Sequence, residues 1–205
     1  MPKEFSNVFS PLGASNHSQD DRQENDYYAT DPEALRLLLK EEMFSKLIWE
    51  PCSGGGHLVD ELKNHGFTVI SSDIIDYGHQ DYLLDFLSTD EFNNQDLDII
   101  TNPPYKYALQ FVKKSLDVVA EGNKVAMFLR LAFLEGQERY TFFKENPPKY
   151  VYIMSDRFTC AKNGEFYKDG KKVGSAIAFG WFVWEKGFKG ESTLRWLKKS
   201  GIESF

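Results

Sequence analysis

The chain has 205 residues, of which 41% are hydrophobic and 15% aromatic, and its formal net charge is −7 at pH 7. This length suits one domain with a full core, and no apolar stretch approaches the ~20 residues of a membrane span, so we do not expect a membrane protein. The negative charge argues mildly against a nucleic-acid binder.

The N-terminal segment differs in composition from the rest of the chain. Residues 1–25 are rich in Ser, Asn, Asp and Gln, so we expect a disordered lead-in, followed by a single domain over residues 26–205. The first residues lack the basic-then-apolar layout of a secretory signal. The two cysteines, Cys52 and Cys160, give no disulfide framework. We therefore expect a cytoplasmic protein.

Helical and strand patterns alternate along the chain. Thr30 or Asp31 can cap a first helix, with Pro32 and Glu33 in its first turn. Strand patterns follow at 46–50, 67–73, 81–87, 96–102, 124–131, 150–154 and 175–186, and helical patterns at 56–66, 107–122 and 136–148. This alternation predicts a Rossmann-like, mostly parallel seven-stranded sheet with helices on both faces.

The C-terminal third departs from this alternation. Residues 155–174 contain three glycines and several charges, and we interpret them as a polar, hairpin-like excursion. The last two strands leave no room for a helix between them, so we expect the last strand to be antiparallel. Two segments are locally basic, 156–172 and 186–199. Each is either a solvated face or a surface that contacts phosphates.

The first motif, "EPCSGGGHL", follows the strand at 46–50. Glycines here allow the backbone to turn tightly and to approach a ligand, and the helix that follows offers a positive end to an anion. A dinucleotide site would place three glycines in the order G-x-G-x-x-G. Gly54 and Gly56 fit this order, but Val59 occupies the last position. A purely structural tight turn is the alternative.

The second motif is Asp73, which closes the strand "TVISSD" and lies 19 positions after Gly54 in the printed sequence. An acidic side chain at this place can accept hydrogen bonds from ribose hydroxyls. A solvated aspartate at a strand end is the alternative for Asp73 alone. Its spacing from the glycines favours a nucleoside pocket at the carboxyl edge of the sheet.

The third motif, Asn102-Pro103-Pro104-Tyr105, ends the strand at 96–102. Proline has no backbone N–H and a fixed φ angle, so the pair can neither continue a central strand nor lie deep in a helix. The Asn102 side-chain oxygen and the Pro103 carbonyl can accept the two hydrogens of a planar amino group, and Tyr105 can stack on the ring that carries it. The motif therefore predicts a site for an exocyclic amine or an amide.

These three motifs, in this order and at these elements, resemble those of the class I S-adenosylmethionine-dependent methyltransferases. Within that group "NPPY" resembles the catalytic motif of the DNA N6-adenine methyltransferases, although protein glutamine and ribosomal RNA guanine methyltransferases share it. The stretches "NDYYATDP", "VAMFLRLAFLEGQ" and "SAIAFGWFVWEKG" resemble small phage and prophage members, which implies that the cytoplasm is that of a bacterial host or a phage-infected cell. The resemblance covers roughly residues 25–197.

The resemblance implies S-adenosylmethionine as the cofactor and assigns residue roles. The implied cofactor contacts are Tyr28, Thr30, Glu50, Pro51, Cys52, Gly54, Gly56, Asp73, Ile74, Asp85, Phe86 and Asn102. Among them Asp73 would bind the ribose and Ile74 would contact the adenine. For Tyr28 and Phe86, packing in the core is the alternative. Asn102, Pro103, Pro104 and Tyr105 would form the catalytic site.

The implied reaction is methyl transfer to an exocyclic amine, with N6 of adenine in DNA as the expected target. The mechanism requires neither a general base nor a metal, and we expect no metal site. A duplex adenine would have to be flipped out to reach Tyr105. Methylation of an RNA base or a protein glutamine amide, and cofactor binding without catalysis, remain alternatives. A partner subunit or a homodimer is possible because the chain has no room for a large recognition domain.

Overall fold

The computed structural model describes residues 28–90, 92–158, 160–162, 164, 166–168, 171–172 and 176–199. The expected lead-in, 1–25, lies outside these residues. The four helices of the described part are α1 (Pro32–Glu41), α2 (His57–Asn64), α3 (Ala108–Val118) and α4 (Gln137–Glu145). None of its helices is long and apolar enough to cross a membrane.

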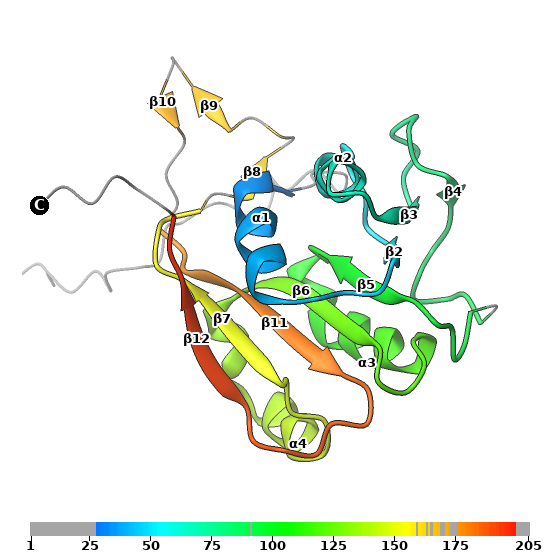
Figure 1. Ribbon diagram of the computed structural model, residues 1–205, viewed down its shortest axis with the longest axis vertical. Helices are drawn as coiled ribbons and strands as arrows, with labels where there is room; N and C mark the ends of the chain where they lie inside the picture. Colours follow the sequence, from blue (N-terminus) through cyan, green and yellow to red (C-terminus); the bar gives the residue numbers. More distant parts are fainter. Residues whose placement is uncertain are drawn as a thin grey trace, which may run out of the picture.

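A mixed sheet runs through the middle of the molecule (Figure 1). Within the described residues it has eight strands in the order β12-β7-β11-β6-β5-β2-β3-β4. The strands are β2 (Leu47–Glu50), β3 (Thr68–Asp73), β4 (Tyr82–Leu83), β5 (Asp98–Thr101), β6 (Lys124–Arg130), β7 (Tyr150–Met154), β11 (Phe179–Glu185) and β12 (Thr193–Leu197). Only β11 runs antiparallel to its neighbours, β6 and β7.

The helices cover both faces of the sheet, as the alternating pattern predicts. The buried side of α1 and α2 packs with Ile48, Ile100 and Phe128 in one core cluster. The buried side of α3 packs with Ile99 and Met127 in a second cluster on the other face. Successive residues of a strand point to opposite faces, which explains why Ile99 and Ile100 divide between the two cores. The expected Rossmann-like architecture is confirmed.

Local sequence signals explain where α1 begins. The Asp31 side chain accepts a hydrogen bond from the backbone N–H of Glu33 at 3.1 Å, and Pro32 occupies the first turn. An N-terminal cap of this kind satisfies an N–H group that the helix itself leaves unpaired. On the sheet side, the Trp181 indole donates to the Ala34 carbonyl at 2.9 Å. The cap and this bond fix α1 over β11.

The sheet differs from the expected one at its edges. The sequence pattern gives seven strands, with the antiparallel one last, whereas β12 follows β11 and pairs in parallel with β7. Four of the five β12 residues are exposed, so the strand lacks the alternating apolar pattern that reveals a half-buried strand. The strand predicted at 81–87 is shorter in the structure, where β4 contains only Tyr82 and Leu83 and a turn follows.

The excursion after β7 contains short strands. In its described part, β9 (Tyr167–Lys168) and β10 (Lys171–Lys172) form an antiparallel pair. The strand β8 (Cys160–Lys162) instead pairs with β1 (Tyr28–Thr30). The β1–β8 pair joins the start of the described chain to the excursion, a contact that the sequence pattern did not indicate.

Candidate functional site

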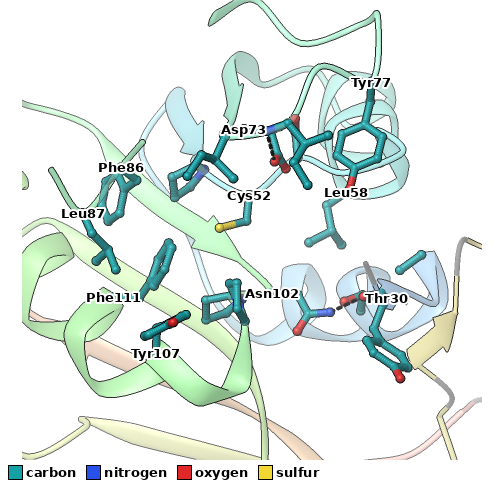
Figure 2. Close-up of a pocket in the computed structure, with 18 of the residues that line it drawn as sticks. Thr30, Cys52, Leu58, Asp73, Tyr77, Phe86, Leu87, Asn102, Tyr107 and Phe111 are labelled. Carbon is teal, nitrogen blue, oxygen red and sulfur yellow. Dashed lines mark hydrogen bonds between the residues drawn. The ribbon is translucent and has the colours of Figure 1, made fainter. Parts of the chain in front are cut away.

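A cavity of about 500 Å³ opens at the edge of the sheet where β2, β3 and β5 end. Figure 2 shows Asp73 and Tyr77 on one side of this space and Asn102 and Tyr107 on the other. The lining residues come from β1 and from the segments that follow these three strands. They are Tyr28, Ala29, Thr30, Pro51, Cys52, Ser53, His57, Leu58, Asp73, Ile74, Ile75, Tyr77, Leu84, Asp85, Phe86, Leu87, Asn102, Pro103, Pro104, Tyr105, Tyr107 and Phe111.

The glycine turn after β2 is tied directly to Asp73. Gly54 and Gly56 have φ angles of 47° and 79°, a region that side chains with a Cβ rarely adopt. The Gly54 backbone N–H donates to Asp73 Oδ2 at 2.9 Å, and the Ile75 N–H donates to Oδ1 at 3.0 Å. The two motifs that the sequence placed together therefore meet, but Asp73 lines the cavity whereas Gly54 and Gly56 lie behind it.

Glu50, at the end of β2, also lies behind the cavity lining. Its side chain is fully buried, accepts a hydrogen bond from the Thr101 hydroxyl at 2.6 Å and lies 3.3 Å from the backbone nitrogen of Cys52. Burial is the main reason why the pKa of Glu50 is raised well above its ordinary value. Glu50 thus links the start of the glycine turn to β5.

The nitrogen and the oxygen of the Asn102 side-chain amide differ in their hydrogen bonding. Its Nδ2, seen in Figure 2 with a dashed hydrogen bond, donates to the backbone carbonyl of Tyr28 at 2.6 Å. The same nitrogen lies 3.9 Å from Cys160 Sγ. Its Oδ1 is buried and has no hydrogen-bond partner among the described residues. A flipped amide would bring two oxygens together, so the Tyr28 carbonyl fixes Oδ1 as the free acceptor.

Tyr105 is held from several sides. Its hydroxyl lies 3.0 Å from Cys160 Sγ, and the Arg130 guanidinium lies 4.7 Å from the centre of its ring. Burial is the largest cause that raises the pKa of Tyr105 well above its ordinary value, and it raises the pKa of Cys160 to about 12. Both side chains are therefore neutral near pH 7, and neither serves as a general base there.

For Phe86 and Tyr28, the sequence left two roles open, packing in the core or contact with the cofactor. Phe86 is 2% exposed, stacks on Phe111 and meets the edge of Trp49, yet it also lines the cavity. Tyr28 is 47% exposed and lines the cavity, so the core-packing alternative is wrong for Tyr28. Asp85, next to Phe86, accepts a hydrogen bond from the Leu87 N–H at 3.0 Å.

Most residues expected at the site meet at this cavity. Twelve of them line it: Tyr28, Thr30, Pro51, Cys52, Asp73, Ile74, Asp85, Phe86, Asn102, Pro103, Pro104 and Tyr105. Sequence reasoning missed Tyr77, Tyr107 and Phe111, which line the cavity, and Cys160, which contacts Asn102 and Tyr105. Tyr107 could have been noticed, because it follows the third motif by two positions. No local signal points to Cys160, since β1–β8 pairing brings it there.

The charge of the lining limits what the cavity can hold. Its described lining contains two carboxylates, Asp73 and Asp85, and neither Lys nor Arg. His57 is the remaining titratable base in that lining, and burial lowers its pKa. A cationic ligand is therefore favoured over a polyphosphate, because nearby negative charges stabilise a cation and repel an anion.

Comparison with known proteins gives similarity in structure but not in sequence. Neither a protein-family model nor a curated protein matches the chain. Two type I restriction-modification proteins are similar in structure. One is the methyltransferase subunit from Streptococcus thermophilus, with a TM-score of 0.58 and 13% identity over 86% of this chain and 48% of that chain. The other is a modification subunit assigned to a type I restriction enzyme of Vibrio vulnificus YJ016. Its TM-score is 0.57, and its sequence identity is 10% over 91% of this chain and 49% of that chain.

A third similar structure is a Listeria monocytogenes protein assigned to the class I S-adenosylmethionine-dependent methyltransferases, with a TM-score of 0.52 and 13% identity over 84% of this chain and 64% of that chain. The chain thus spans about half to two thirds of the length of these proteins. At such identities the likeness concerns the fold.

Proposed function

We propose that this chain, which has the fold of the class I S-adenosylmethionine-dependent methyltransferases, transfers a methyl group to an exocyclic amine. The proposed target is N6 of adenine in DNA. The observation that carries the proposal is the buried, unpartnered Oδ1 of Asn102 at a cavity lined by two carboxylates. Leaving a buried acceptor unpaired costs about 1–3 kcal/mol, and an amino group that enters the cavity can satisfy it.

The cavity lining suits S-adenosylmethionine in its charge and in its mixture of acceptors and apolar surface. Asp73 has both oxygens fixed by backbone N–H groups, so further lone pairs remain in place to accept ribose hydroxyls. Ile74 and Phe86 supply apolar surface for an adenine ring. The carboxylates of Asp73 and Asp85 favour a positively charged sulfonium and ammonium. When bound, S-adenosylmethionine supplies a methyl carbon that a nitrogen lone pair can attack as the carbon–sulfur bond breaks.

The residues of the third motif act on the target amine in this proposal. Asn102 Oδ1 and the Pro103 carbonyl accept its two hydrogens and favour a more tetrahedral nitrogen, whose lone pair then leaves the plane of the ring. The same two acceptors stabilise the positive charge that develops on nitrogen, and the surplus proton passes to water. Tyr105 orients the ring that bears the amine, and correct positioning supplies much of the remaining acceleration.

The choice of adenine in DNA rests on the resemblance of the third motif to that of the N6-adenine methyltransferases. An RNA base or a glutamine amide presents a similar planar amino group, so a direct assay distinguishes these targets. The protein is incubated with S-adenosylmethionine labelled in its methyl group and with separate pools of DNA, RNA and protein. We expect label in DNA, recovered as N6-methyladenine. Label in RNA or protein would refute the DNA target, and no label in any pool would refute catalysis.

A further inference from the structure

Two cations lie over tyrosines at the cavity, one over Tyr105 of the third motif and one over Tyr107, two positions after it, although the cavity lining itself is acidic. Arg130 ends β6, and its guanidinium lies 4.7 Å from the centre of the Tyr105 ring. The ammonium of Lys106 lies 5.2 Å from the centre of the Tyr107 ring. Both cations are exposed, and both tyrosines line the cavity. Positive charge thus borders the side of the cavity that holds Asn102.

Neither cation is paired with an acidic side chain in the described part of the chain. Among the residues that the structure describes, no carboxylate lies within ion-pair distance of Arg130 or Lys106. By contrast, Lys113 and Lys114 of α3 pair with Glu138 and Asp90, at 3.4 and 3.0 Å. A cation–π contact uses no carboxylate, so the N–H groups of Arg130 are not committed to an acidic partner and can form a bidentate bond to an anion.

Two lysines of another basic segment, 186–199, are engaged by backbone carbonyls. In the segment 186–199, the Lys186 ammonium donates to the Val119 carbonyl at 2.7 Å, just beyond the C-terminal end of α3. Lys189 donates to the Glu145 carbonyl at 3.1 Å, at the end of α4. Cations at these positions stabilise the carbonyl ends of helices. These two lysines therefore have structural roles away from the cavity.

We propose that Arg130 and Lys106 bind backbone phosphates that flank the target base, which makes a nucleic acid the substrate class of this site. The inference rests on the proposed function and extends it, because the amine acceptor alone does not distinguish a nucleobase from a glutamine amide. Phosphate contacts position a nucleic acid without reading its sequence. With these phosphate contacts, each ligand lies beside protein charges of the opposite sign. The cationic cofactor lies beside Asp73 and Asp85, and the polyanion lies beside Arg130 and Lys106.

The test measures DNA binding by the full chain as a function of salt. A fluorescein-labelled DNA duplex is titrated with the protein, in the presence of S-adenosylhomocysteine, at several KCl concentrations. The variants are Arg130→Gln, Lys106→Gln and the double variant. Lys63→Gln, an exposed lysine on α2 outside the cavity lining, is the matched control for loss of one charge. Arg130→Lys keeps the charge but loses the planar stacking group.

Each neutralising substitution should lower the slope of log Kd against log salt by about 0.9 and weaken binding several-fold. Lys63→Gln and Arg130→Lys should keep the wild-type slope. Unchanged slopes in Arg130→Gln and Lys106→Gln, or the same loss in Lys63→Gln, would overturn the proposal. Calorimetry with S-adenosylhomocysteine should give wild-type affinity in all variants, which shows that each has folded.

Methyl-transfer kinetics on unlabelled DNA separate this inference from the proposed function. If the double variant raises KM for DNA with kcat unchanged, both are supported. If DNA is methylated with the same kcat/KM by wild type and double variant, the phosphate site is refuted and the proposed function stands. If the variants lose salt-dependent DNA binding but wild type methylates no DNA, the proposed target is refuted and the phosphate site stands.

Discussion

The oxygen acceptors at the two ends of the cavity differ in whether the protein itself supplies their hydrogen-bond donors. At the β3 end, Asp73 and Asp85 accept hydrogen bonds from backbone N–H groups, which fix their positions before any ligand arrives. At the β5 end, Asn102 is fixed through its nitrogen, and its oxygen has no partner in the described residues. Fixed carboxylates suit tight binding, whereas an unsatisfied acceptor suits a group that enters for reaction. The first end is therefore the expected cofactor end and the second the expected target end.

The largest expected effect is at the target end. Asn102→Ala removes an acceptor that matters most in the transition state, so kcat should fall by about 10²-fold or more, by analogy with loss of an oxyanion-hole partner. Steady-state methyl transfer measures this loss, and calorimetry measures cofactor affinity, which should stay nearly unchanged. Full activity in Asn102→Ala would show that the target amine is held elsewhere.

At the cofactor end, Asp73→Ala should weaken S-adenosylmethionine binding by roughly 1.5–3 kcal/mol, because charge-assisted hydrogen bonds to the ribose are lost. The glycine turn also loses the acceptor of the Gly54 N–H. Asp73→Asn is the matched control, since it keeps one acceptor oxygen for the turn and should weaken binding less. Titration calorimetry measures both, and unchanged affinity in Asp73→Ala would remove Asp73 from the cofactor site.

Two substitutions of Tyr105 test whether its ring or its hydroxyl group is needed at the target end. Tyr105→Ala removes the ring and should weaken capture of a flipped base by about 1–3 kcal/mol, seen as a higher KM for DNA. Tyr105→Phe keeps the ring and loses only the contact between its hydroxyl and Cys160, so it should be tolerated. A Phe variant as impaired as the Ala variant would assign the effect to the hydroxyl and contradict stacking.

The smallest expected effect concerns Glu50 behind the cofactor end. Burial raises its pKa, so its neutral form is favoured in the fold, and folding stability is lost as pH rises from the ordinary 4.5 through the folded-state pKa. Glu50→Gln is always neutral and should remove this loss. Urea midpoints at about pH 5 and about pH 8 should therefore fall less in the variant than in wild type. An equal fall in both proteins would show that Glu50 does not titrate in this range.

The sequence predicted the parts of this molecule that local rules determine. The cap at Asp31, the alternation that gives a doubly wound sheet, and the turn at Gly54 and Gly56 each depend on neighbouring residues, and the structure confirms them. The position of Asp73 followed from a general rule, because the carboxyl ends of parallel strands share one edge.

Features that depend on distant contacts were missed. The β1–β8 pairing brings the Tyr28 carbonyl to Asn102 and Cys160 to Tyr105, and no pattern near either strand indicates that pairing. The exposed edge strand β12 lacks alternation, so it was missed as well. The hydrogen bond between Glu50 and Thr101 joins two neighbouring strands that are far apart in sequence, so the glycine motif alone does not reveal it.

The most direct test of the account is a pair of calorimetric titrations of the wild-type chain, one with S-adenosylmethionine and one with NAD. The cavity lining has two carboxylates and neither Lys nor Arg among its described residues, so it should bind the sulfonium and repel two phosphates. The account predicts one S-adenosylmethionine per chain and little or no binding of NAD. Tight NAD binding without any response to S-adenosylmethionine would contradict it.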